Sequence, residues 1–134
     1  MAQMTTLTKF NNTVDQMMEN LIERYSYHSY FSRELNLTRE KFNLIRKTNP
    51  MKVIEGILVW VYPYKKQIMD EDDSFFLRKN YEEDTDNEGH LVKALRIKEL
   101  WESDMDDNTK KALFNYFKVF IVLAEKYVAE KMSK

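Results

Sequence analysis

Apolar positions recur at three- and four-residue spacing along much of the chain, a pattern typical of amphipathic α-helices. One such stripe covers residues 6–25. A denser run covers residues 108–132, and within residues 112–124 only Asn115 and Lys118 are polar. A helix with so wide an apolar face lies at the centre of a bundle or forms half of an interface. We favour the central position, with self-association through this helix as the alternative.

Two shorter helices are predicted on either side of the pair Asn49-Pro50. The first covers residues 38–47 and follows a loop or irregular turn at residues 26–36. The second begins at the pair itself, because Asn caps free amides and Pro loses nothing at the first helical position. It continues to about Ile68.

Residues 57–62 are the one place where a strand competes with a helix. The run is β-branched and aromatic, which favours a strand. We prefer a helix, because a cap precedes it and no partner strand is visible elsewhere. Pro63 removes one hydrogen bond and crowds the carbonyl of Val59, so a kink is expected there.

An acidic loop at residues 70–89 separates these helices from another at residues 90–103. Within the loop, residues 74–77 are apolar and are expected to form a helical turn that covers the core. Only two glycines and two prolines occur in 134 residues, whereas sheets need glycine-rich turns more often than bundles do. The fold class is therefore all-α: one domain over residues 1–134, with about five helices and a central C-terminal helix.

The composition argues against most kinds of enzyme. The absence of cysteine removes disulfides, thiolate zinc sites and cysteine nucleophiles. His28 and His90 lie at no metal-ligand spacing, and two glycines cannot build a phosphate-binding loop. The chain also lacks a secretion signal and an apolar run of membrane-spanning length. We expect a soluble intracellular protein with no catalytic residue, no metal, no cofactor and no membrane partner.

Charge is unevenly distributed along the chain. Residues 70–88 hold nine acidic side chains against Arg78 and Lys79, which gives −7 in a chain whose net charge is −1. We expect this loop, with the two phenylalanines inside it, to bind a basic surface of a protein partner. The expected contact residues are Asp72, Asp73, Phe75, Phe76, Glu82, Glu83, Asp84 and Asp86.

The same acidic residues allow two weaker metal hypotheses. Residues 84–89 match the first half of a calcium loop, but the twelfth position is Leu95, where a bidentate Glu is required. Residues 70–73, together with Asp84 or Asp86, would hold magnesium as in a metal-dependent hydrolase only if their carboxylates converged in a cleft. Carboxylates adjacent in sequence usually point apart into water, so a solvated acidic loop is the preferred interpretation.

Nucleic-acid binding is the alternative function, because aromatic and basic residues are interleaved between residues 25 and 52. Aromatic rings stack on bases, and cations neutralise phosphates. The competing interpretation is that the rings pack on the core and the cations form a solvated face. The residues concerned are Tyr27, Tyr30, Arg33, Arg39, Lys41, Arg46 and Lys47.

An ordered pattern of aromatics and prolines covers residues 47–127. It comprises Asn49-Pro50, Tyr62-Pro63-Tyr64, Ile68, Asp72, Phe75-Phe76-Leu77, Tyr81, Leu100-Trp101 and Tyr116. This pattern resembles small helical proteins of the nucleocytoplasmic large DNA viruses. The resemblance carries over no active-site residue. It implies a viral structural or adaptor protein that binds a viral or host protein in the host cytoplasm, the viral factory or the virion.

Overall fold

The regular structure is entirely helical in the part of the chain that the computed structural model describes, which comprises residues 5–77, 102 and 105–133. Three long helices are joined by shorter pieces. The elements are α1 (Thr6–Arg24), α2 (Ser29–Thr48), α3 (Lys52–Trp60), the 3-10 helix η1 (Tyr62–Tyr64), α4 (Lys65–Met69), α5 (Ser74–Leu77) and α9 (Asp107–Met132). The all-α helical bundle expected from the sequence is confirmed.

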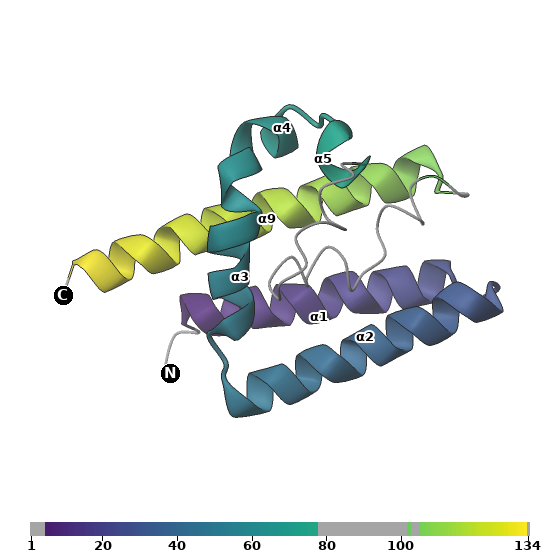
Figure 1. Cartoon of the computed structure of the whole chain (residues 1–134), viewed down its shortest axis with the longest axis horizontal. Helices are drawn as coiled ribbons and strands as arrows, with labels where there is room; N and C mark the ends of the chain where they lie inside the picture. The colour runs from purple at the N-terminus through teal and green to yellow at the C-terminus, as the bar shows by residue number, and fades with distance from the viewer. Residues whose placement is uncertain (1–4, 78–101, 103–104, 134) are drawn as a thin grey trace.

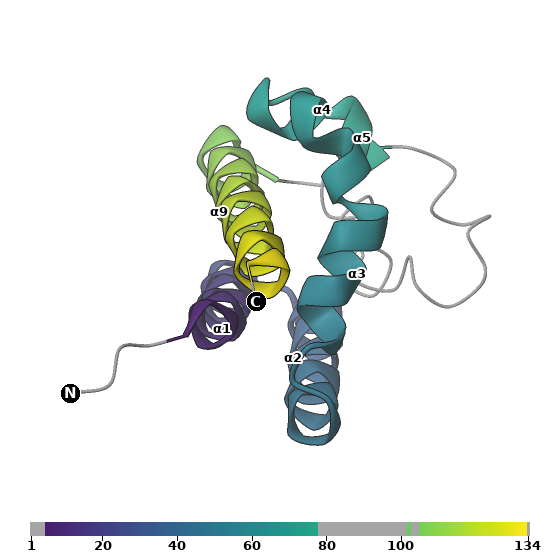
Figure 2. The same cartoon turned by 90° about the vertical axis from the view of Figure 1, so that its left-hand side faces the viewer.

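The three long helices lie alongside one another, and α3 runs across α1 and α9 (Figure 1). Viewed from the end of the molecule, α1, α2, α3 and α9 surround a shared interior (Figure 2). α1 and α9 run antiparallel and are tied near both ends. Thr6 Oγ1 donates to Glu130 Oε2 at 2.9 Å, and Arg24 Nη1 donates to Thr109 Oγ1 at 2.9 Å.

α9 is the central helix, as its wide apolar face predicts. It packs against α1, α3 and α4, so different sides of the helix are covered by different elements. Phe117 and Phe120 are fully buried, with ring centroids 5.4 Å apart, and Phe120 also lies 5.2 Å from Phe10 of α1. Val119 and Val122 remain exposed, so the covering is incomplete on one side.

α1 forms where the sequence predicts it. Thr5 is the N-cap, and its hydroxyl accepts a hydrogen bond of 3.0 Å from the amide of Thr8. The buried face follows a spacing of four, three and four residues through Phe10, Val14, Met17 and Leu21. This stripe packs against both α2 and α9.

The expected loop at residues 26–36 is wrong, because α2 begins at Ser29 rather than at residue 38. The side chain of His28 caps the helix by accepting a 3.3 Å hydrogen bond from the amide of Phe31. The buried stripe of α2 then continues N-terminally as Phe31, Leu35, Thr38 and Phe42. Thr38 fits this apolar stripe because its hydroxyl donates to the carbonyl of Glu34 at 3.0 Å.

Residues 57–60 are helical, which confirms the choice of helix over strand. The helix start expected at Asn49-Pro50 is wrong by two residues, because α3 begins at Lys52 with Met51 as its N-cap. The Asn49 side-chain oxygen instead accepts from the amide of Met51 at 3.1 Å, in the turn before the helix. α3 ends at Trp60, before Pro63, and the chain tightens into η1 and resumes as α4. The interruption expected at Pro63 is therefore confirmed.

The segment at residues 74–77 forms a helical turn, α5, as expected. Phe75 and Phe76 are both 0 % exposed, however, and their rings pack on α9. The ring centroid of Phe76 lies 5.2 Å from that of Phe114 and 5.1 Å from that of Phe117. The expectation that this pair lines a recognition surface is wrong, because the core contacts of the two rings exclude a partner.

Several sequence-based expectations fall outside the described residues. They concern the partner-binding role of Glu82, Glu83, Asp84 and Asp86, the calcium-like loop at residues 84–89, and the helix at residues 90–103. Of that helix only Glu102 is described, and it is helical.

Candidate functional site

A row of exposed apolar side chains runs along the outer face of α2. Tyr30, Leu37 and Leu44 are 38 %, 46 % and 64 % exposed. They are spaced by seven residues, which is close to two helical turns, so they lie almost in line along the helix. We call these three residues the α2 stripe. It faces away from the buried stripe of the same helix.

Charged residues flank the α2 stripe on both sides. One flank is formed by the charged residue three positions after each stripe residue, which is Arg33, Glu40 or Lys47 in turn. The other flank is formed by the charged residues four positions after Tyr30 and Leu37, which are Glu34 and Lys41. Charge alternates in sign along each flank.

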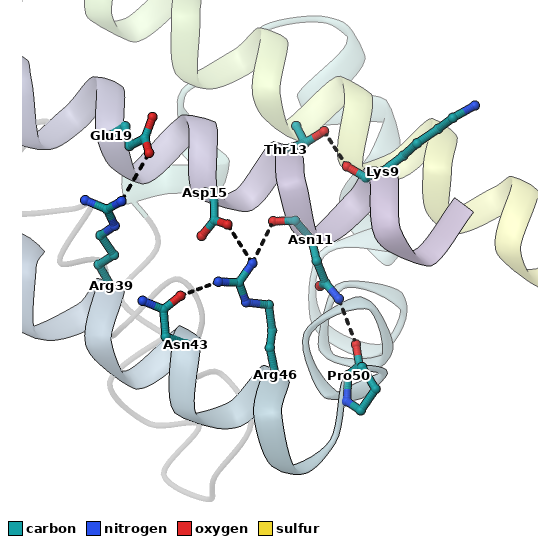
Figure 3. A network of polar contacts seen from close by, with 9 residues as sticks. All are labelled: Lys9, Asn11, Thr13, Asp15, Glu19, Arg39, Asn43, Arg46 and Pro50. Carbon is teal, nitrogen blue, oxygen red and sulfur yellow. Dashed lines mark hydrogen bonds and ion pairs between the residues drawn. The ribbon is translucent and has the colours of Figure 1, made fainter. Parts of the chain in front are cut away.

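Two ion pairs fix the rotation of α2 against α1 (Figure 3). Arg39 Nη2 lies 3.1 Å from Glu19 Oε1, and Arg46 Nη1 lies 2.7 Å from Asp15 Oδ2. Both arginines project from the side of α2 that faces α1, so the α2 stripe is held facing away from the bundle.

The second ion pair belongs to a wider polar network (Figure 3). Arg46 also donates to the backbone carbonyl of Asn11 at 3.4 Å and to the side-chain oxygen of Asn43. Asn11 Nδ2 in turn donates to the carbonyl of Pro50 at 3.1 Å. The network therefore joins α1, α2 and the turn into α3.

The residues expected to bind nucleic acid do not form one surface. Arg39 and Arg46 point toward α1 and pair with its carboxylates. The other five, Tyr27, Tyr30, Arg33, Lys41 and Lys47, are exposed. Tyr27 precedes α2, and its ring is stacked on buried Tyr25 at 6.2 Å between centroids. The acidic side chain of Glu40 lies between Arg33 and Lys47 on their flank of α2.

The described part of the acidic segment is tied to the fold by its own carboxylates. Glu71 accepts hydrogen bonds from Lys111 and from Lys118, the latter at 2.7 Å. These ammonium groups, Lys111 first, lower the pKa of Glu71. Asp72 accepts from the backbone amide of Ser74 at 3.0 Å, and this bond lowers the pKa of Asp72. Glu71 and Asp72 therefore stabilise the approach to α5.

Asp72 and Asp73 are exposed, as a partner-binding role requires. They directly precede α5, which begins at Ser74. Among the residues whose positions are described, no group of three or more acidic, histidine or cysteine side chains is placed to hold a metal ion.

A third carboxylate ties η1 and α4 to α9. Glu125 Oε2 accepts from the Tyr62 hydroxyl at 2.8 Å and from Lys65 Nζ at 2.6 Å. The hydrogen bond from Lys65 is the main cause of a lowered pKa at Glu125. The same carboxylate raises the pKa of both Lys65 and Tyr62. This contact joins the segment that follows α3 to the C-terminal half of α9.

Leu37 and Leu44 were not recognised from the sequence as candidate site residues. Their signal is the seven-residue spacing from Tyr30, which is offset from the buried stripe of the same helix. A seven-residue spacing places the three side chains in line only if residues 29–37 are helical. Because a loop was expected there, the row could not be recognised.

A scan of protein-family models, a search of curated proteins and a search of solved structures each found no match to this chain. No helix within residues 5–77 and 105–133 has the length and apolar character needed to cross a bilayer.

Proposed function

We propose that this chain is a non-enzymatic interaction protein, and that it binds a protein partner through the α2 stripe. The observation that carries the proposal is the alignment of Tyr30, Leu37 and Leu44 on one exposed helix face. Apolar residues scattered singly over a surface need no explanation, whereas an aligned row with a charged rim is typical of a helix-binding surface.

The rigidity of α2 supports this role. Its inner face is buried against α1 and α3, and the ion pairs at Arg39 and Arg46 set its rotation. A surface that is already ordered loses little conformational entropy when a partner binds. The three stripe residues are therefore presented in the orientation that binding requires.

The resemblance to proteins of large DNA viruses supports a proposed setting. In that setting the chain acts as a structural or adaptor protein for a viral or host partner in the host cytoplasm, the viral factory or the virion. The exposed carboxylates of Asp72 and Asp73 remain a second proposed contact, directed at basic residues of a partner. Phe75 and Phe76 have no part in it, because they are core residues.

The charge on the outer face of α2 favours a protein over nucleic acid. Arg33, Lys41 and Lys47 alternate with Glu34 and Glu40. A phosphate backbone selects a continuous positive surface, because each neutralised phosphate releases counterions. Mixed charge around an apolar row is instead typical of the rim of a protein–protein contact.

Site-specific photocrosslinking tests the proposal. A photoreactive amino acid replaces Leu44 in the full chain, which is then irradiated inside expressing cells. A matched variant carries the same group at Val122, an apolar residue of α9 that is 54 % exposed. We expect crosslinks to another polypeptide from position 44 and none from position 122. Crosslinks from position 122 alone, or from neither position, would show that the α2 stripe is not the binding surface.

A further inference from the structure

We propose that the polypeptide bound at the α2 stripe is a second copy of this chain, with the two α2 helices packed antiparallel. This proposal rests on the proposed function, because it specifies the occupant of the same surface. It is carried by the self-complementary arrangement of apolar and charged residues along α2.

The apolar residues match when a two-fold axis passes beside Leu37. Leu37 then meets Leu37 of the second copy. Tyr30 and Leu44 lie seven residues before and after Leu37, so each of them lies opposite the other in the second copy. At about 1.5 Å of rise per residue, both contacts are roughly 10 Å from the axis. One register therefore aligns all three members of the stripe.

The charges match in the same register. A two-fold axis perpendicular to the helices brings each flank of α2 against the same flank of the other copy. Glu34 and Lys41 share one flank, so Glu34 lies level with Lys41 of the second copy. Arg33 and Glu40 share the other flank and form the equivalent pair. Exposed ion pairs contribute little affinity, but they select the partner and the register.

Two further features favour the antiparallel direction. Parallel helices would also place opposite charges together, because Glu34 would then meet Arg33 and Lys41 would meet Glu40. They would, however, align both helix dipoles and oppose Tyr30 to Tyr30. Antiparallel helices place the positive end of one dipole beside the negative end of the other. They also oppose the large ring of Tyr30 to the smaller side chain of Leu44.

The contact is small, since each copy contributes three apolar side chains and their flanks. Interfaces of this size belong to the weak, transient class. We expect a dissociation constant on the order of 10 μM, so that monomer and dimer exchange within an accessible concentration range.

Sedimentation equilibrium of the full chain across that range provides the primary test. We expect a reversible monomer–dimer equilibrium. Leu37→Glu places two carboxylates at the two-fold axis and should leave a folded monomer at every concentration. Val122→Glu is the control on α9 and should dimerise like the native chain. A native chain that is monomeric throughout, or a Leu37→Glu variant that still dimerises, would overturn the proposal.

Charge exchange tests the register. Lys41→Glu sets like charges against each other on one flank and should weaken dimerisation about tenfold. The double variant with Glu34→Lys and Lys41→Glu restores opposite charges and should recover most of the native affinity. A double variant as weak as Lys41→Glu alone would exclude this pairing of the two residues.

Crosslinking tests the direction, and the absence of cysteine makes single-cysteine variants unambiguous. A Tyr30→Cys chain is mixed with a Leu44→Cys chain and treated with a short bismaleimide. We expect a crosslinked heterodimer. Efficient crosslinking of Leu44→Cys to itself would instead show parallel helices and contradict the proposal.

The two proposals fail in distinguishable ways. A monomeric native chain whose photoreactive position 44 still crosslinks to a different polypeptide leaves the proposed function intact and removes the self-pairing. A monomeric chain that gives no crosslink from position 44 removes both.

Discussion

The carboxylate of Glu71 lies 2.7 Å from the ammonium group of Lys118 and joins the segment before α5 to the middle of α9. Glu71 has a φ of 56°, in the left-handed region that residues with a Cβ rarely adopt. Its hydrogen bonds to Lys111 and Lys118 hold the side chain against α9. The turn directs the following residues inward, which is how Phe75 and Phe76 reach the core.

Stability at acid pH should depend on Glu71. The pKa of the Glu71 carboxyl is lowered in the folded state, so its charged form stabilises the fold fully at pH values above its ordinary pKa of 4.5. This stabilisation is lost as the pH falls through the lowered, folded-state pKa. At pH values below 4.5, the melting temperature of Glu71→Gln should fall less steeply with decreasing pH than that of the native chain. Melting by circular dichroism between pH 7 and pH 3 measures this difference. Equal slopes for the two chains would contradict this account.

Alkaline pH should weaken the contact at Glu125. The raised pKa of Lys65 and Tyr62 implies a stabilising contribution that is complete below their ordinary pKa values of 10.5 and 10.0. The contribution is lost as pH rises through the raised values. Tyr62→Phe keeps the ring but removes the hydroxyl, so it should melt below the native chain at pH 8. The two melting temperatures should converge at strongly alkaline pH, and a constant difference would contradict this account.

Phe76 should behave as a core residue. Removing a fully buried ring leaves a cavity, so Phe76→Ala should lower the free energy of unfolding by about 3–5 kcal/mol. Leu44→Ala, on the exposed stripe, should change it by less than about 0.5 kcal/mol in the monomer. Urea denaturation at low protein concentration measures both values. Similar small losses for the two variants would show that Phe76 is not packed in the core.

Gly56 offers a site for stabilisation. It lies inside α3, and among the described residues a Cβ built there has no atom within 4 Å apart from its chain neighbours and the backbone of its own helix. Glycine in a helix interior costs about 0.5–1 kcal/mol relative to alanine, because it loses more backbone freedom on folding. Gly56→Ala should therefore raise the free energy of unfolding by about that amount. An unchanged or lower value would indicate that the space beside Gly56 is filled.

Nucleic-acid binding is tested by its dependence on salt. We expect short single- and double-stranded DNA and RNA to leave the sedimentation of the chain unchanged at low salt. Binding that weakens steeply as salt increases would favour the alternative function. In that case Arg33→Ala and Lys47→Ala should each reduce the slope, because each removes one phosphate contact.

The helices that could be predicted from the sequence are those whose spacing of apolar residues matches the face that is buried in the structure. α1 and α9 each carry a continuous apolar stripe, and both form where it predicts them. α3 begins at Lys52, two residues after the start expected at Pro50. α2 was only half predicted. His28 is an unusual capping residue, and buried Thr38 interrupts the apolar pattern of the inner stripe.

The position of Phe75 and Phe76 was read only in part from local sequence, which predicted a helical turn over the core but also a recognition surface on the same two rings. Acidic neighbours suggest a solvated loop, but burial of the pair depends on distant contacts from Lys111, Lys118 and Phe114. The candidate site was missed for a related reason. The alignment of Leu37 and Leu44 with Tyr30 emerges only once the whole of α2 is known to be helical.

The antiparallel pairing of α1 with α9 has a consequence for synthesis on the ribosome. α1 leaves the ribosome first among the described elements, but the helix that covers much of its apolar stripe is made last among them. Roughly 80 residues separate the two helices, which at about 5–20 residues per second corresponds to a delay on the order of 10 s. During that interval Phe10, Met17 and their neighbours lack the cover that α9 provides. The nascent chain is therefore a natural client for chaperones, and chains that end before α9 should aggregate.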